Sequence, residues 1–410
     1  MSSSFRLFLG NLAYNQAAST RSHCSCAKTG GGNCLRFNSW WQIVLKTRNV
    51  RIPGIYKPLV ELLESVTSIN DAAALEIENI TNKKIKDISK VSLAELFIPA
   101  EILNAISLDV GRTCPTIPFF KRSGQRQIKR ILMVYSLFDP QVGYVQGMNF
   151  LAANLLWHSN EEQAFWMLIS IMLLYDVRSM FLPLFPGVFR RSEILSSLIC
   201  CKMKDIHSHF ESHGLDVHMM VSDWLMTLFA QSIPVEQLGC LWDSFFSLGW
   251  TAIYNIIIYR ISKLKHIILK LSDVADIIKI VKHGQVKTSF WSFTSELEQA
   301  YVHSTGDPKQ DCSEMWAHTI SSSKKSKLES WEVYSLEKKE HNDYQDTFIF
   351  HKSRSLMISR ILSKNGKDNI TQMLEDTLEK LQQLLDKLLA ENLYQMHLRY
   401  LVEECSVRNC

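Results

Sequence analysis

Glycine and proline are both scarce in this chain, with 16 and 10 in 410 residues. Folds built from many short strands need frequent turn residues, so this scarcity disfavours them and favours helices. An excess of charge of one sign is also lacking, because a formal net charge of +4 is small for this length. The sequence therefore predicts no nucleic-acid partner, and it contains no RNP, zinc-finger or basic-zipper pattern.

Long apolar runs are missing as well. The longest one, "FWMLISIMLLY", is too short to cross a bilayer. The hydrophobic share of 46% and the charged share of 21% are typical of a globular protein with a real core. Acidic residues are absent from the first 60 residues, which hold eight basic ones. This bias favours a flexible basic tail, with a transit peptide or a contact with anionic membranes as the alternatives.

Paired cysteine spacings are a further absence. The ten cysteines are scattered, and several lie in apolar helical stretches, which indicates reduced thiols in a cytoplasmic protein. His23, Cys24, Cys26 and Cys34 are the one candidate metal cluster, but they lack the C-x2-C pairs of common zinc sites. No metal site is predicted.

Helical periodicity is what the sequence does have. We expect a flexible basic segment at 1–38, a helical domain at 39–300, a polar linker or mobile insertion at 301–365, and an amphipathic helix at 366–405. The predicted fold class is all-α. The last helix carries a short coiled-coil seam, which either pairs with a second copy or packs back onto the domain. Its leucines are Leu374, Leu378, Leu381, Leu385 and Leu388.

The stretch "GYVQGMNFLAANLL", residues 143–156, predicts a helix with one apolar face. Gln146 stands at its start and points about 150° away from the centre of that face. Taken alone, this glutamine is a helix cap. Just downstream, Ser159 and Glu162 have the spacing of a capping box for the next helix.

Two other stretches stand out on either side. In "ISLDVGRTCP", Asp109 precedes Arg112 by three residues, so a local ion pair is the simplest interpretation. In "WLMTLFAQSIPVEQLGCLWDSFF", the pattern predicts two buried helices with an aromatic core, joined at a proline. The marked residues of this third stretch are Trp224, Pro234, Trp242 and Asp243.

These three stretches, in this order, resemble the three signature motifs of the TBC domain, a family of GTPase-activating proteins for Rab small GTPases. The resemblance extends over about Arg51 to Ile280. It implies a multi-helical domain in two helical subdomains. It also implies a Rab partner in its GTP state, a role in vesicle-mediated transport, and a cytoplasmic location with peripheral recruitment to endomembranes.

The resemblance assigns roles to single residues. It implies that Arg112 is an arginine finger and Gln146 a glutamine finger, both supplied in trans to the Rab. An arginine offers a permanently charged planar fork, and a glutamine amide can both accept and donate. No cofactor of its own is expected, since GTP and Mg²⁺ belong to the partner. The implied supporting residues are Asp109, Thr113, Tyr144, Gly147 and Asn149.

Some positions depart from the family pattern. Cys240 and Leu241 stand where an arginine often precedes the Trp-Asp step, and Lys57 and Glu61 replace usual residues at the domain entry. Neither departure touches the two fingers. The alternative function is a catalytically weak Rab-binding scaffold, and a third is an adaptor that acts through the C-terminal helix. Retention of both finger residues favours an active GTPase activator, with no independent catalysis of its own.

Overall fold

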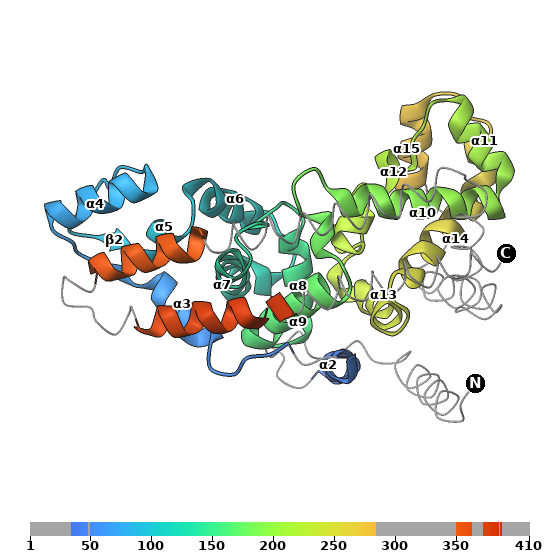
Figure 1. The fold of residues 1–410 in the computed structure, drawn as a ribbon. Coiled ribbons are helices and arrows are strands. Elements are labelled where there is room, and N and C mark those ends of the chain that lie inside the picture. The colour runs from blue at the N-terminus through green and yellow to red at the C-terminus, as the bar shows by residue number, and fades with distance from the viewer. Residues whose placement is uncertain (1–33, 48–49, 284–349, 363–371, 385, 388–410) are drawn as a thin grey trace, which may run out of the picture.

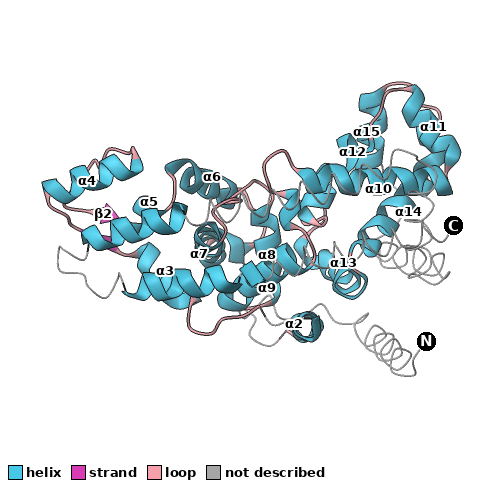
Figure 2. Ribbon diagram, in the orientation of Figure 1, coloured by secondary structure: helices cyan, strands magenta, loops and turns pink. Residues whose placement is uncertain are grey.

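The computed structural model describes residues 34–47, 50–283, 350–362, 372–384 and 386–387. Most of the described chain is helical, which confirms the all-α prediction (Figures 1 and 2). Two short strands, β1 (Val66–Thr67) and β2 (Val91–Ser92), pair antiparallel with Val66 opposite Ser92. The scarcity of turn residues therefore indicated the right fold class.

The described helices form two lobes that meet at α8 and α9, with α3 to α7 in one and α10 to α15 in the other (Figure 1). The bounds in chain order are α2 Leu35–Thr47, α3 Tyr56–Glu64, α4 Asp71–Thr81, α5 Leu93–Phe97, α6 Ala100–Gly111, η2 Pro118–Lys121, α7 Ser123–Phe138, α8 Met148–His158, α9 Glu161–Leu174, η3 Arg178–Met180, α10 Pro186–Lys202, α11 Lys204–Ser212, α12 Val217–Thr227, α13 Val235–Leu248, α14 Trp250–Ile268 and α15 Val274–His283.

Helix α8 lies at the centre of this arrangement. It contacts α6, α7 and α9 on one side and α12 and α13 on the other. The sequence predicted a single apolar face, but nine of its eleven residues are buried. The one-faced prediction was wrong because Asn149 and Asn154, counted as polar, are buried too.

The N-cap of helix α9 is Asn160, one residue later than the predicted cap Ser159. Asn160 accepts from the Gln163 N–H at 2.9 Å, and the Gln163 side chain accepts from the Asn160 N–H at 3.4 Å. Ser159 instead ends α8, and its hydroxyl donates to the Leu155 carbonyl at 2.8 Å. The predicted Ser159–Glu162 box was therefore wrong, because asparagine caps a helix as well as serine does.

Helix α2 crosses the domain start that was expected at residue 39. It packs against α13, and its Phe37 and Trp40 are 2% and 1% exposed. The structure therefore continues the helical domain into the segment where a flexible tail was predicted, as far as its first described residue, Cys34.

Residues 350–362 and 372–387 are helical where the structure describes them. These two segments, orange and red in Figure 1, lie beside α5 and α7. Ile358, Ile361, Leu374 and Leu381 join the same hydrophobic core as the domain. A cavity of about 150 Å³ remains between these two segments and the ends of α5, α6 and α7.

The predicted leucine seam is buried where it is described. Leu374, Leu378 and Leu381 are 1%, 3% and 0% exposed, whereas Leu385 and Leu388 lie outside the residues whose side chains are described. These three leucines therefore pack back onto the domain, which is one of the two alternatives predicted for this helix. The first of these two helical segments, 350–362, lies inside the range expected to be a linker.

Among the residues described, no helix combines the length and the apolar character needed to cross a bilayer. In the same ranges Cys114, Cys200 and Cys201 carry free thiols, in agreement with the reduced state expected from the sequence. Three members of the candidate metal cluster, His23, Cys24 and Cys26, lie outside the described residues.

Candidate functional site

Arg112 stands at the C-terminal end of α6, where its backbone N–H donates to the carbonyls of Asp109 and Val110. Its guanidinium donates from Nε and Nη2 to one oxygen of Asp109, at 2.9 and 2.5 Å. The ion pair expected from the spacing of these two residues is therefore present. The Arg112 side chain is 58% exposed, whereas that of Asp109 is 9% exposed. A buried carboxylate thus anchors an accessible cation.

Gln146 lies in a turn rather than on the helix. Met148 N–H donates to the Val145 carbonyl at 3.2 Å, and α8 begins only at Met148. The prediction that Gln146 opens the helix was therefore wrong by two residues. Its side chain is exposed, and its amide makes no hydrogen bond with any described residue. The helix-cap interpretation of Gln146 fails, because the N-cap position belongs to Gly147.

The turn depends on two glycines. Gly147 has φ +112°, and a Cβ there would lie 3.3 Å from the Thr227 methyl and 3.6 Å from the Phe181 ring. Gly143 has φ +58°, and a Cβ would meet Ile102 at 2.7 Å. Only glycine adopts such backbone conformations without strain. The turn is therefore held close against both lobes, by Ile102 of α6 on one side and Thr227 of α12 on the other.

A closed hydrogen-bond network connects the first motif to the second. Tyr144 donates its hydroxyl to the second Asp109 oxygen at 2.6 Å and lies 3.3 Å from the Asn149 amide oxygen. Asn149 donates to the Thr113 hydroxyl at 2.8 Å, and Thr113 donates to the Asp109 carbonyl at 2.7 Å. The Asn149 oxygen also accepts from the Gly147 N–H at 3.1 Å.

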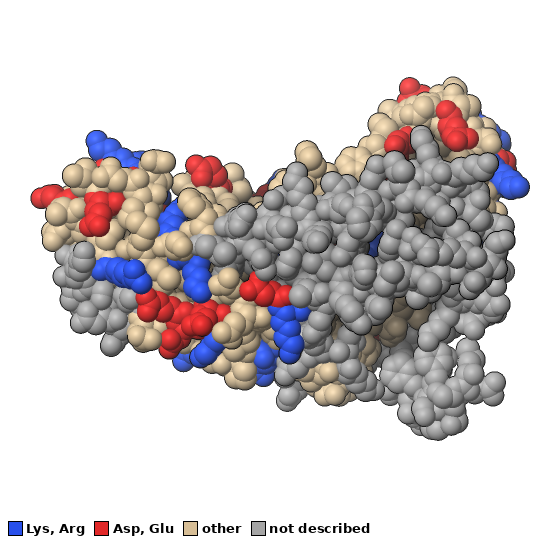
Figure 3. Space-filling view, in the orientation of Figure 1, with Lys and Arg blue, Asp and Glu red and all other residues tan. Residues whose placement is uncertain are grey.

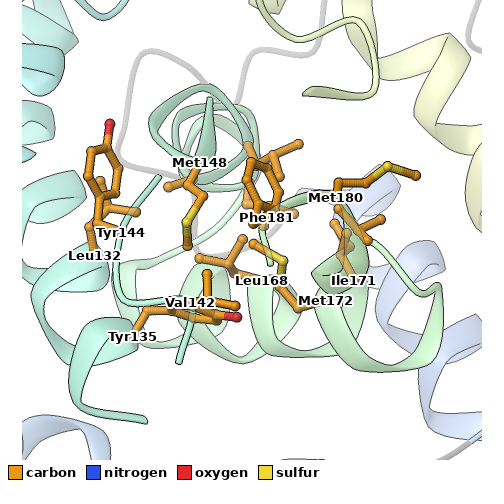
Figure 4. Packing of buried hydrophobic residues seen from close by; sticks show 14 of the residues in the cluster. Leu132, Tyr135, Val142, Tyr144, Met148, Leu168, Ile171, Met172, Met180 and Phe181 are labelled. Atoms are coloured by element: carbon orange, nitrogen blue, oxygen red, sulfur yellow. The ribbon is translucent and has the colours of Figure 1, made fainter. Parts of the chain in front are cut away.

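Every member of this network except Arg112 and Gly147 is a buried polar side chain, from 0% exposed for Thr113 and Asn149 to 8% for Tyr144. Burial and the neighbouring Asp109 carboxylate raise the pKa of Tyr144 well above its usual range. The phenol therefore stays protonated and donates. Buried networks that are fully satisfied fix side-chain positions. In Figure 4 the Tyr144 hydroxyl points away from the apolar cluster that Met148 enters.

A second buried ion pair holds the chain just before this turn. Asp139 is 0% exposed and accepts from Arg178 at 2.7 and 3.0 Å through both carboxylate oxygens. It also accepts from the Tyr135 hydroxyl at 3.1 Å, and its own carbonyl accepts from the Gly143 N–H at 2.7 Å. The Arg178 fork also donates to Gln141.

Sequence reasoning missed this ion pair. No pattern in the sequence marks Asp139 and Arg178 as a pair. The two residues are 39 positions apart, so no local spacing indicates their contact. The Asp-Pro step was the only available signal, since aspartate before proline commonly starts a turn.

The third motif lies in the core rather than at the surface. Trp242 is 0% exposed and donates its indole N–H to the Leu228 carbonyl at 3.1 Å. Trp224 stacks on Phe229 with ring centroids 5.0 Å apart, and Pro234 caps the N-terminus of α13. Trp242 of α13 thus holds the residue that ends α12, and both tryptophans are buried, as the pattern predicted.

Asp243 ties α13 to α2. It accepts from Trp40 at 2.7 Å and from Arg36 at 3.0 Å. Arg36 also donates to the Cys240 sulfur at 3.6 Å, so a guanidinium from α2 lies beside the position where the family pattern usually has an arginine. The departure at Cys240 thus leaves Asp243 paired with a positive charge.

No group of three or more His, Cys, Asp or Glu side chains in the described ranges is placed to hold a metal ion. What the first two motifs do provide is a rigid polar base that carries two accessible side chains, a guanidinium and a primary amide. Such a pair can stabilise negative charge and orient a polar reactant that another molecule brings.

A family model for the Rab-GTPase-TBC domain matches residues 33–269, more than half of the chain. The chain belongs to the Rab-GTPase-TBC domain family. This confirms the resemblance carried by the three motifs, and the matched residues include α2.

Three relatives show how far the likeness extends. Rab GTPase-activating protein tbc-11 of Caenorhabditis elegans is 35% identical over 200 residues, 47% of this chain and 21% of the relative. TBC1 domain family member 1 of Homo sapiens is 32% identical, over 44% of this chain and 16% of the relative. Growth hormone-regulated TBC protein 1 of Rattus norvegicus is 31% identical, over 46% of this chain and 68% of the relative. The chain thus spans a small part of the first two relatives.

Proposed function

We propose that this protein is a GTPase-activating protein for a Rab small GTPase in its GTP state, with Arg112 and Gln146 supplied in trans. Membership of the Rab-GTPase-TBC domain family supports the class of partner. The single observation that carries the catalytic proposal is the network of Asp109, Tyr144, Asn149 and Thr113. It joins the base of Arg112 to the turn of Gln146 and leaves both side chains accessible.

In this proposal Arg112 neutralises charge that develops on the transferred phosphoryl group. Phosphoryl transfer is catalysed mainly by positioning and by electrostatic stabilisation, and an arginine supplied by a partner is worth about 10³–10⁵ in rate. Asp109 holds Nε and Nη2 of Arg112, so Nη1 remains for the phosphate: it makes no hydrogen bond with any described residue. The ion pair with Asp109 therefore orients the Arg112 guanidinium and leaves Nη1 available to a ligand.

Gln146 would orient the attacking water. Its amide oxygen can accept from the water while its NH₂ donates to the γ-phosphate. The Gly147 backbone and the Asn149 side chain brace the turn from below. GTP and Mg²⁺ would come with the Rab, so this chain needs no cofactor of its own.

The test uses the full chain and a panel of GTP-loaded Rabs, with phosphate release as the measurement. We expect a large acceleration for at least one Rab. Binding to the same Rabs carrying GDP and aluminium fluoride, a transition-state mimic, is measured in parallel. Binding without acceleration for any Rab would favour the scaffold alternative instead.

Recruitment to endomembranes and a role in vesicle-mediated transport follow from the proposed partner. The measurement that addresses them is co-localisation of the tagged full chain with the Rab that responds in the panel. A responsive Rab and a protein that stays away from its membrane would contradict this part of the proposal.

A further inference from the structure

A cavity of about 380 Å³ lies in the second lobe, between α10, α11 and the start of α12. Its lining includes none of the marked residues of the three motifs. The volume lies within the range of about 300–1,000 Å³ that is typical of small-ligand sites. The family assignment and the two fingers give this cavity no role.

Apart from His207 and His218, the ionisable residues that line the cavity are acidic. Glu193, Glu211 and Asp216 line it, and no lysine or arginine does so among the described residues. Figure 3 shows acidic side chains at the surface of the lobe that carries α11 and α12. His207 lies 3.3 Å from Glu211, and His218 lies 2.9 Å from Asp216. A concave site lined by carboxylates concentrates cations.

The cavity also has aromatic walls. Phe210 is 2% exposed, whereas Phe189 lines the cavity and remains 50% exposed. The Phe189 ring lies 5.2 Å from the His218 ring. An aromatic face next to carboxylates suits a flat organic cation. A guanidinium group is planar, so it stacks on aromatic rings and donates paired hydrogen bonds to a carboxylate, which an ammonium group does less well.

Ser192 provides an independent observation. It is 3% exposed, lines the cavity, and its hydroxyl has no hydrogen-bond partner among the described residues. A serine in a helix commonly donates to the carbonyl four residues earlier, as Ser170 does to Trp166 at 2.8 Å in α9. A buried hydroxyl without a partner is costly. Ser192 is therefore a polar group that a bound ligand would satisfy.

We infer that this cavity is a binding site for a guanidinium group, as in an arginine side chain. Asp216 would accept from the guanidinium, Phe189 would stack on its face, and the Ser192 hydroxyl would accept one N–H at the bottom of the cavity. The site is independent of Arg112 and Gln146, so the Rab assay and this proposal can fail separately.

The test is isothermal titration of the full chain with two probes, N-acetyl-arginine amide and an acetylated Gly-Arg-Gly amide. The matched control probe carries citrulline, which keeps the shape of arginine and removes the charge. We expect saturable binding of both arginine probes and at least about tenfold weaker binding of citrulline. Tighter binding of the tripeptide would assign the ligand to a polypeptide, and equal binding to a free small molecule. Both results support a guanidinium site.

Three variants locate the site. Asp216→Asn keeps an oxygen for the helix cap that now accepts from the His218 N–H, so we expect an intact fold and about fivefold weaker binding. Ser192→Ala removes a hydroxyl that has no partner in the described chain, so we expect a Tm that is equal to or higher than that of the wild type and about threefold weaker binding. Asp273→Asn is the matched control, since Asp273 caps α15 and does not line the cavity.

Three results would overturn the inference. They are the absence of saturable binding by either arginine probe, equal binding of the citrulline probe, and equal weakening by Asp273→Asn and Asp216→Asn. Unaltered affinity in Ser192→Ala would remove the reason for placing the ligand at the bottom of the cavity, and the proposal would fall with it.

Discussion

The finger site and the third motif differ in which kind of residue is buried. Around Arg112 and Gln146 the buried groups are polar, and the residues proposed to act are exposed. Around Trp242 the buried groups are aromatic, and the one carboxylate, Asp243, is held by α2. A satisfied polar network adds little net stability but fixes geometry, whereas aromatic burial stabilises without providing chemistry. Substitutions in the two regions should therefore fail in different ways.

The largest expected effect is on rate, at the finger site. Arg112→Ala should keep the melting temperature and lower Rab-stimulated phosphate release by about 10³-fold or more, because a transition-state charge is lost. Arg112→Lys should restore little, since lysine lacks the planar fork. Arg126→Ala, another arginine of the same lobe on α7, is the matched control. An unfolded or fully active Arg112→Ala protein would reduce Arg112 to a structural ion pair.

Gln146→Ala should lower stimulated hydrolysis by about 10²–10³-fold, the usual cost of removing one transition-state hydrogen-bond donor. The fold should be intact, because the side chain is exposed and makes no hydrogen bond with described residues. The assay crosses this variant with a Rab whose own switch glutamine is changed to leucine. That Rab should still respond, at least in part, to the wild-type protein. A Rab variant without response, together with a normally active Gln146→Ala, would refute the glutamine finger.

Trp242→Ala should fail by unfolding. Removing a fully buried tryptophan typically costs about 3–5 kcal/mol, a large part of the stability of a domain. We expect poor expression or a clearly lowered Tm, measured by thermal or urea unfolding, while Trp242→Phe should lose less. A stable Trp242→Ala protein with weakened Rab binding would show that the third motif contributes to the Rab interface. The contrast between the two regions would then be wrong.

Acid should weaken the aromatic region. His158 is 2% exposed, its ring lies 5.1 Å from that of Trp40, and burial, with a smaller effect of Arg36, lowers its pKa to about 3. Between about pH 6.5 and this value the unfolded chain binds a proton that the folded chain does not. Stability should therefore fall as the pH falls below 6.5, by up to about 1.4 kcal/mol per pH unit from this group.

The measurement is urea unfolding at pH 7.0, 6.0 and 5.0 for the wild type and for His158→Gln. Glutamine does not titrate, so the variant should have a shallower pH dependence even if it is less stable at neutral pH. If the free energy of unfolding changes equally with pH in both proteins, groups other than His158 cause the sensitivity to acid.

The smallest expected effect is at Tyr144→Phe, which tests whether the polar network only orients. The change removes the hydroxyl that donates to Asp109. We expect a loss of about 1 kcal/mol in stability and a fall in stimulated rate on the order of tenfold, since Arg112 loses part of its support. Binding of the Rab should change little. A stability loss as large as that of Trp242→Ala would show that the network is a stabilising core after all.

Local sequence patterns predicted the elements well and the boundaries less well. The periodicity of "GYVQGMNFLAANLL" placed a helix correctly, but Gln146 precedes it in a turn, because Gly147 takes the N-cap position with φ +112°. The capping box of α9 was displaced by one residue for a similar reason. Several residue types cap helices, and a single sequence does not say which neighbour does so.

Contacts between distant residues were beyond the sequence. Asp109 and Arg112 are three residues apart on one turn, so their ion pair could be predicted. The pairs Arg178–Asp139 and Arg36–Asp243 join residues 39 and 207 positions apart, and the burial that gives them their effect exists only in the folded chain.

The sequence by itself determined the helices, the aromatic core of the third motif and the residue types proposed to act, because propensity, periodicity and side-chain chemistry are local properties. The tertiary structure decided that Tyr144 and Asn149 connect the two finger motifs, and that the C-terminal leucines pack back onto the domain. It also left Ser192 unsatisfied in a carboxylate-lined cavity. These outcomes depend on which surfaces meet when the lobes assemble, and burial changes the energy of a polar group only after that.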